Sequence, residues 1–332
     1  MITIKDIARI AGVSQSTVSK CLNDRPDVSA ETKIKVINIA KEMNFSPHAF
    51  GKALKTKASE NIGVLFCRDL HSLASNPFYS RVLEGIEAEL AVNNFNLLLQ
   101  IVTETTKDEL PKMMRERQVD GLILVGTFKE SYLHRILDEN GNIVLIDPKK
   151  SYESHCQILI DNEDGAFQAT KYLIDHGHEK IGFISGDISR LSFQQRYNGY
   201  VKALKYNKIP LRPELVRAGG LENGYDHVKY LLETQKLTAI FSANDINAIC
   251  GYKAVNEMRL RIPDDISIIG FDDIDIAKIS SPPLTTVRVY KEELGSLAVR
   301  TLLRLIQGET EKAATIIVTT KLVERESVKR LK

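Results

Sequence analysis

Four polar side chains near the start of the sequence have the types and the spacing to read the edges of DNA bases. Gln15, Ser16, Ser19 and Lys20 fall on one side of a short helical stretch, opposite Val18. Glutamine bonds adenine through two atoms, lysine reaches the acceptors of guanine, and serine bonds either base. A helix that presents such groups from its N-terminal half can enter the major groove. Recognition of a DNA sequence is therefore the chemistry that this segment suggests.

Three short helices are expected to position these side chains within residues 1–46. Thr3 is a helix N-cap with an acidic residue three positions later, and Gly12 ends the apolar pattern that follows. Ser14 is placed to begin the second helix and Ser29 the third. The apolar positions of the third helix are Ile34, Ile37, Ala40 and Met43. Two helices joined by a tight turn and braced by a third form a helix-turn-helix. A three-helix module that binds another protein is the alternative.

The charge of the chain is unevenly distributed. The 332 residues carry a formal net charge of +2. Residues 1–60 have ten basic and six acidic side chains, a net charge of +4, which leaves −2 on the remainder. A small basic segment before a nearly neutral body favours contact with a polyanion. A solvated, lysine-rich surface would explain the same charge.

The cysteines and the N-terminus indicate a cytoplasmic protein without a metal or other cofactor. Cys21, Cys67, Cys156 and Cys250 lie too far apart for metal-ligand spacing and are too few for a disulfide framework. The three histidines His155, His176 and His178 have no further ligand nearby, so we expect them in loops or caps. The sequence shows no apolar core of a secretory signal, and no apolar run approaches the roughly 18 residues of a membrane span.

From residue 61 onward, strand-like and helix-like stretches alternate. Residues 62–66 are continuously apolar, as is typical of a parallel strand that is buried on both faces. Further strands are expected at residues 95–102, 121–125, 143–146, 157–160, 181–185, 215–218, 238–242, 267–271 and 284–287. Helical patterns cover residues 81–93, 164–176, 196–206 and 222–234. This alternation predicts doubly wound parallel sheets, and about ten strands favour two lobes over one compact sheet.

Sequence motifs along nearly the whole chain resemble the LacI/GalR family of transcriptional regulators. In the basic segment the resemblance rests on residues 4–8, 11–14, 16–19, 22–23 and 45–47. In the body it rests on Gly270-Phe271-Asp272-Asp273 and on residues 119–123, 161–162, 177–178, 263–266 and 283–287. The stretch 67–77 is longer than in many relatives, which is a departure from the family pattern beside the implied ligand contacts.

The resemblance implies a DNA-binding surface and a hinge. Its DNA-contacting positions in the first segment are Thr3, Ser14, Gln15, Ser16, Thr17, Ser19, Lys20, Asn23 and Ser29. In the hinge they are His48, Ala49, Lys52, Leu54, Lys55 and Lys57. Leu54 would insert between base steps in the minor groove. Gly51 stands where the family has alanine, and glycine weakens a helix by about 1 kcal/mol, so hinge folding would depend more on DNA. The implied partners are a palindromic operator and a second copy of the chain, with a tetramer as an open alternative.

The resemblance also implies the domain plan. A small all-α helix-turn-helix domain (1–46) and a hinge (47–60) precede an α/β body of two doubly wound parallel-sheet lobes, like a periplasmic sugar-binding protein. The first lobe takes residues 61–160 and 290–319, the second takes 161–289, and residues 320–332 are a C-terminal tail. A small molecule would bind between the lobes. Its implied contacts are Phe78, Asp147, Ser192, Arg196, Leu221, Asn244 and Asp272.

These observations predict a DNA-binding repressor of carbohydrate-utilisation genes, whose operator affinity responds to a sugar or sugar derivative. The alternative is a regulator of the same family in which the ligand, or a partner protein, strengthens DNA binding. An enzyme is not expected, because the sequence lacks the nucleotide-binding, serine-hydrolase and zinc-protease motifs. The pair Asp272 and Asp273 would have no partner for acid–base catalysis.

Overall fold

The computed structural model describes most of the chain as two compact units, residues 1–60 and 61–332. The described residues are 2–22, 25–43, 45, 59–67, 73, 76–103, 109–139, 141–220, 223–310 and 313–331. The expected DNA contacts at Asn23, His48, Ala49, Lys52, Leu54, Lys55 and Lys57, and the expected ligand contact at Leu221, lie outside them.

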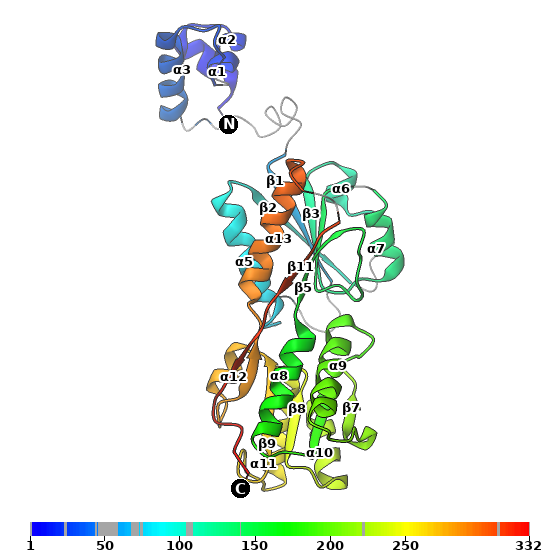
Figure 1. The fold of residues 1–332 in the computed structure, drawn as a ribbon. Coiled ribbons are helices and arrows are strands. Elements are labelled where there is room, and N and C mark those ends of the chain that lie inside the picture. The colour runs from blue at the N-terminus through cyan, green and yellow to red at the C-terminus, as the bar shows by residue number, and fades with distance from the viewer. Residues whose placement is uncertain are drawn as a thin grey trace. The chain divides into compact units, whose positions relative to one another are not determined.

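The first unit contains the three expected helices, α1 (Ile4–Ala11), α2 (Gln15–Leu22) and α3 (Ala30–Glu42) (Figure 1). The Thr3 hydroxyl accepts from the Asp6 amide, and the Asp6 carboxylate accepts from the Thr3 amide, which forms a capping box. Gly12 ends α1 with φ +69°, a left-handed conformation that glycine adopts without strain. The helix-turn-helix therefore follows from local capping and turn chemistry.

Only part of the apolar set of α3 faces the core of the first unit. Val36 and Ala40 are buried against α1 and α2, whereas Ile34 is 61% exposed and Ile37 is 37% exposed. Residues four apart share one face of a helix, so the burial of Val36 with Ala40 turns Ile34 and Ile37 outward. The prediction of a third helix is confirmed, and of its apolar positions Ala40 is buried whereas Ile34 and Ile37 are exposed.

The first lobe of the second unit is built on a six-stranded sheet of order β11-β5-β4-β3-β1-β2, in which the paired strands run parallel. Its strands are β1 (Asn61–Cys67), β2 (Asn96–Val102), β3 (Gly121–Val125), β4 (Ile143–Ile146), β5 (Cys156–Ile160) and β11 (Thr315–Val318). Its helices are α5 (Tyr79–Val92), α6 (Lys112–Arg115), α7 (Glu130–Leu137) and α13 (Lys291–Ile306).

The second lobe repeats this plan with the strand order β12-β10-β9-β8-β6-β7. Its strands are β6 (Ile181–Ser185), β7 (Val216–Ala218), β8 (Ala239–Ser242), β9 (Ser267–Asp272), β10 (Thr285–Arg288) and β12 (Lys321–Val323). Its helices are α8 (Asn162–Asp175), α9 (Leu191–Tyr206), α10 (Gly224–Thr234), α11 (Asp245–Glu257) and α12 (Asp275–Ile279), with a 3₁₀ turn at Pro213–Leu215. The expectation of two parallel-sheet α/β lobes is confirmed.

Helices α5 and α13 pack closely on one flank of the first sheet (Figure 1). A side chain at Gly85 would collide with the backbone of Glu292, and one at Gly295 would collide with the backbone of Val82. Both positions therefore need glycine for the close approach of the two helices. This contact fixes the start of α13, which follows directly after the chain leaves the second lobe.

The chain passes between the lobes after β5, after β10 and after β11. The last passage corrects the assignment of residues 320–332 as a tail, because β12 pairs antiparallel with β10 in the second sheet. Ser327 is buried and donates to the Ile268 carbonyl at 2.5 Å. An antiparallel edge strand can be short and charged outside, which is why its sequence resembles a tail.

No helix among the described residues is both long enough and apolar enough to cross a lipid bilayer.

Candidate ligand-binding and DNA-binding sites

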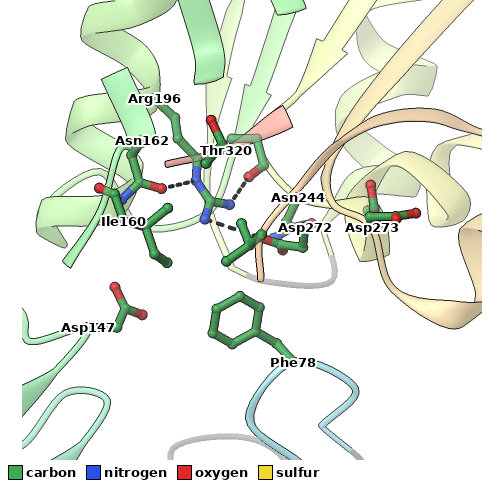
Figure 2. A network of polar contacts seen from close by, with 12 residues as sticks. Phe78, Asp147, Ile160, Asn162, Arg196, Asn244, Asp272, Asp273 and Thr320 are labelled. Carbon is green, nitrogen blue, oxygen red and sulfur yellow. Dashed lines mark hydrogen bonds and ion pairs between the residues drawn. The ribbon is translucent and has the colours of Figure 1, made fainter. Parts of the chain in front are cut away.

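Polar side chains gather where strands of both sheets end. Asp147 follows β4, Asn244 follows β8 and Asp272 is the last residue of β9. The carboxyl ends of parallel strands are the usual place for ligands in such sheets. Figure 2 shows Phe78 and Asp147 extending from the first lobe toward the part of the second lobe that carries Arg196 and Asp272.

Arg196 on α9 is the centre of this group. Its side chain is buried, with 4% of the residue exposed. Its Nε donates to Asn162 Oδ1 at 2.8 Å, its Nη1 donates to the Ala243 carbonyl at 2.5 Å, and its Nη2 lies 3.0 Å from Asp272 Oδ1 (Figure 2). The guanidinium carbon also lies 3.8 Å from the centre of the Phe271 ring. Arg196 is thus held on each side and fixes the Asp272 carboxylate.

Asp272 is held in an unusual backbone conformation. Its φ is +110°, and that of Asp273 is +51°, a region that costs a non-glycine residue about 1–3 kcal/mol. Burial raises the pKa of Asp272, although the charges of Arg196 and Lys291 oppose the rise. The Asp272 carboxyl group is buried, and the fixed Arg196 guanidinium lies beside it. Such a group can accept hydrogen bonds from a ligand.

Asp147 is the corresponding carboxyl group of the first lobe. It also has a positive φ, +49°. Its Oδ2 accepts a hydrogen bond of 2.8 Å from the Tyr79 hydroxyl. Burial raises the pKa of Asp147, while hydrogen bonds from Tyr79 and Ser192 and the charges of Arg196 and Arg190 act in the opposite direction. Since Ser192, Arg190 and Arg196 belong to the second lobe, Asp147 faces the other lobe directly.

The remaining expected ligand residues have partly structural roles. Asn244 is the N-cap of α11, and its Oδ1 accepts from the Asn247 amide at 2.7 Å. Ser192 is buried in the first turn of α9. The Phe78 ring is half-buried and meets the Tyr79 ring edge to face, with centroids 5.1 Å apart. Phe78, Asp147, Arg196, Asn244 and Asp272 appear together in Figure 2.

Two further acids, Asp245 and Asp273, belong to the same region as Asp272. Asp245 accepts from the Ile274 amide at 2.9 Å and from the Thr286 hydroxyl at 2.6 Å. Burial and the neighbouring Asp272 raise the pKa of Asp245 to about 8. Burial also acts to raise the pKa of Asp273, but ion pairs with Arg325 (2.6 Å) and Arg288 (2.7 Å) hold it below the ordinary value.

Three residues of this region were missed by the sequence prediction. Tyr79 orients Asp147, Asn162 orients Arg196, and the Lys291 ammonium group donates to the Asp272 carbonyl at 2.6 Å. Asn162 belonged to a recognised motif and Tyr79 is adjacent to Phe78, so both had a signal. The signal for Lys291 was its spacing of three and seven residues from Leu294 and Ala298, which puts it on the inward face of its helix.

The lobes also touch outside this group. Arg81 on α5 forms an ion pair of 2.7 Å with Asp275 on α12, and the Leu191 amide donates to the Lys149 carbonyl at 2.8 Å. A polar cavity of about 230 Å³ lies beside the passage from β10 to α13. It is lined by Pro77, Arg81, Asp273, Asp275, Lys278, Arg288, Val289, Tyr290, Lys291 and Glu292.

In the first unit, the expected base-reading residues lie on the surface of α2. Gln15, Ser16 and Lys20 are exposed, and Thr17 and Ser19 are half-buried. The Lys20 ammonium group pairs with Asp27 at 2.6 Å. Three other expected contacts are exposed N-caps, since the hydroxyls of Thr3, Ser14 and Ser29 accept from backbone amides. The surface of α2 therefore presents hydrogen-bonding groups of the kind that DNA bases recognise.

Within the described residues, no group of histidine, cysteine and acidic side chains has an arrangement that could hold a metal ion. Cys21, Cys67, Cys156 and Cys250 are free thiols.

Comparison with known proteins agrees with this arrangement. Residues 3–48 match the family described as bacterial regulatory proteins, lacI family, and residues 170–328 match a periplasmic binding protein-like domain. The chain is 36% identical to the ribose operon repressor of Haemophilus influenzae, over 100% of both chains. It is 34% identical to the HTH-type transcriptional repressor PurR of Pasteurella multocida, over 99% of both. A crystal structure of the Lac repressor dimer bound to operator and an anti-inducer superposes with a TM-score of 0.86, at 28% identity and 99% coverage of both chains. The chain therefore belongs to the LacI/GalR family of DNA-binding transcriptional regulators.

Proposed function

We propose that this protein represses carbohydrate-utilisation genes and that a small, neutral sugar bound between its lobes controls its affinity for operator DNA. The observation that carries this proposal is the pair of carboxyl groups, Asp147 and Asp272, presented from opposite lobes around Arg196. Two carboxylates accept hydrogen bonds and offer none when ionised. A ligand that satisfies both needs donors on two sides, as a ring of hydroxyl groups provides.

The charge of the group argues for a neutral ligand. Arg196 already pairs with Asp272, and Asp147 adds a further negative charge nearby. A phosphorylated or strongly acidic ligand would place its charge beside these carboxylates, at a cost that rises with burial. The Phe78 ring adds an apolar surface for the C–H face of a sugar. The relative named ribose operon repressor supports D-ribose as the first candidate.

A nucleobase is the second candidate, because the PurR repressor of Pasteurella multocida is 34% identical over nearly the full chain. A planar base needs stacking surfaces on its faces and has fewer donors than a sugar. Position 221, a ligand contact implied by the family resemblance, is leucine, which has no ring to stack on a planar base. One fewer stacking surface favours the sugar.

We also propose that two copies of the chain act together on a palindromic operator. One helix-turn-helix reads one half-site, and paired units read two. We propose that the exposed residues of α2 and the hinge residues 47–60 contact the DNA. Leu54 would insert between base steps in the minor groove. Ile279 is 82% exposed on α12 and lies beside the exposed Ile276, which makes α12 a candidate surface for the second copy. The relation to the Lac repressor dimer supports this assembly.

The experiment that tests the ligand class is isothermal titration calorimetry on the full chain with D-ribose, adenine and guanine. The proposal expects binding of D-ribose and much weaker binding of either base. Tight binding of a base without binding of ribose would replace the sugar by the second candidate. A parallel titration of a palindromic duplex selected from a random library would show whether the bound ligand weakens operator binding, as an inducer does, or strengthens it, as a corepressor does.

A further inference from the structure

Lys291 is a buried lysine at the point where the chain passes from the second lobe to the first. It is the first residue of α13, and only 6% of it is exposed. Its ammonium group donates to three backbone carbonyls, those of Asp272 (2.6 Å), Asp273 (3.1 Å) and Val289 (3.2 Å). A buried ammonium group with all three protons in hydrogen bonds is a fixed structural charge.

Two of these carbonyls belong to the residues with strained backbones. Asp272 and Asp273 both have positive φ. Strain of this kind persists only where surrounding contacts hold it. The side chain of Asp272 pairs with Arg196, and that of Asp273 pairs with Arg288 and Arg325. Lys291 instead binds the backbone carbonyls of the two aspartates.

The position of Lys291 links this strained turn to the other lobe. Asp272 ends β9 in the second sheet, whereas α13 packs on α5 in the first lobe. A rotation of the lobes about the β10–α13 passage therefore acts through this ammonium group on the carbonyls that it binds. Lys291 therefore binds the backbone of the same residue whose carboxylate faces Arg196.

We propose that Lys291 is a positioning residue, which couples the lobe arrangement to the ligand-facing Asp272 carboxylate by holding the backbone of Asp272 and Asp273. This inference rests on the proposed function only for the identity of the ligand. When the first lobe moves, Lys291 carries the turn with it and shifts the carboxylate relative to Arg196. Ligand bound at Asp272 favours one lobe arrangement through the same contact.

The burial of Lys291 is consistent with this role. Burial lowers the pKa of Lys291, while the carboxyl groups of Asp272, Asp273, Asp245 and Glu292 act to raise it. The lysine is thus costly to bury and is stabilised mainly by the turn that it holds. A side chain needed only to fill space at this position could be apolar.

The test compares Lys291→Met, which keeps the length of the side chain and removes the charge, with the control Lys278→Met. Lys278 lines the same polar cavity but pairs with the exposed Asp275 at 3.0 Å and does not bind the turn. The first readout needs no ligand. Hydrogen–deuterium exchange of the amides of residues 272–275 should be at least about ten-fold faster in Lys291→Met and unchanged in Lys278→Met. Equal exchange in the wild type and Lys291→Met would overturn the proposal.

The second readout separates positioning from general stability. With a selected operator duplex and D-ribose as the probe, Lys291→Met should bind the duplex like the wild type without ribose and lose most of the ribose-dependent change in affinity. Retention of the full change would overturn the coupling role. A different result would have ribose leave the operator affinity of the wild type unchanged while exchange at residues 272–275 still accelerates in Lys291→Met. In that case the proposed ligand is wrong and the positioning role stands. If Lys291→Met does not fold, Lys291→Gln, which removes the charge and shortens the side chain, takes its place and should also accelerate exchange at residues 272–275; unchanged exchange in that variant would refute the proposal.

Discussion

Tyr79 and Asp147 are 68 residues apart in the sequence, yet the Tyr79 hydroxyl donates a hydrogen bond of 2.8 Å to the Asp147 carboxylate. Tyr79 begins α5, and Asp147 follows β4 with a positive φ. The tyrosine therefore fixes the direction in which the carboxylate faces the second lobe.

Replacement of Tyr79 by phenylalanine should weaken D-ribose binding about ten-fold or more. A hydrogen bond to a charged group contributes about 1.5–3 kcal/mol, and its loss lets the carboxylate turn away. Calorimetric titration measures the change. The control is Tyr200→Phe, which removes a hydrogen bond of 2.8 Å to the Ile181 carbonyl within the second lobe. That variant should unfold at lower urea concentration with unchanged ribose affinity, and an equal loss of affinity in both variants would argue against an orienting role for Tyr79.

Replacement of Arg196 by alanine should abolish ribose binding and leave the DNA-binding unit folded. The change removes the cation beside Asp272 and leaves a buried carboxylate unpaired, which costs about 3–5 kcal/mol. The matched control is Arg300→Ala, because Arg300 is exposed and its pair with Glu89 spans 3.4 Å. Calorimetry gives the ribose affinity, and circular dichroism reports folding. Ribose binding by a folded Arg196→Ala variant would remove Arg196 from the site.

The buried Asp245 should make the stability of the chain depend on pH. Its pKa is about 8 in the folded chain, compared with 3.8 for an ordinary aspartate. Between these values the folded chain keeps a proton that the unfolded chain has released, so this group lowers stability as pH rises from about 4 to about 8, by at most about 1.4 kcal/mol per pH unit.

Asp245→Asn cannot ionise and keeps groups that can bond Ile274 and Thr286. Its free energy of unfolding, measured with urea at about pH 5 and about pH 8, should decline less with pH than that of the wild type. Parallel curves for the two proteins would show that Asp245 does not titrate in this range.

Asp27 should act against DNA binding, because it holds the Lys20 ammonium group at 2.6 Å. Asp27→Asn frees the lysine for a base or a phosphate and removes a negative charge near the DNA, so the affinity for a selected operator should rise several-fold. Fluorescence anisotropy at several salt concentrations measures this change.

Lys20→Ala should alter the preference for particular bases, whereas Lys57→Ala should weaken all duplexes alike and reduce the salt dependence. A uniform loss of affinity in both lysine variants would contradict base reading by Lys20.

Ile279→Asp should convert the proposed dimer into a monomer, since a buried charge in an apolar contact is unfavourable. Sedimentation measures the mass, and anisotropy measures the accompanying loss of operator affinity. Tyr206→Asp, at a residue that is 70% exposed on α9, serves as the control and should stay dimeric. A dimeric Ile279→Asp protein would exclude α12 as the contact.

Local patterns predicted the elements well. Thr3, Gly12 and Ser29 defined the helix ends through their own caps. Residues 62–66 indicated a buried strand because both faces of β1 are covered. Contacts between distant segments were harder to predict. Three features depend on segments that are distant in the sequence: the exposure of Ile34, the hydrogen bond from Lys291 to the Asp272 carbonyl, and the hydrogen bond from Ser327 to the Ile268 carbonyl. One sequence does not show which segments meet.

The grouping of the candidate ligand contacts was expected from the family resemblance and not from a local pattern. Asp272 belongs to a recognised motif, Asp147 and Arg196 were implied by the family resemblance, and the structure brings the three side chains together. Their orienting partners Tyr79, Asn162 and Lys291 were missed, because a residue that acts through another carries no signature of its own chemistry.

The central claim is that a sugar at Asp147, Arg196 and Asp272 controls operator binding. The most direct measurement is the anisotropy of a fluorescent, selected operator duplex titrated with the wild type and with Arg196→Ala, each with and without D-ribose. We expect ribose to change the dissociation constant of the wild type about ten-fold or more and to leave that of Arg196→Ala unchanged. No effect of ribose on the wild type, or an equal effect on both proteins, would contradict it.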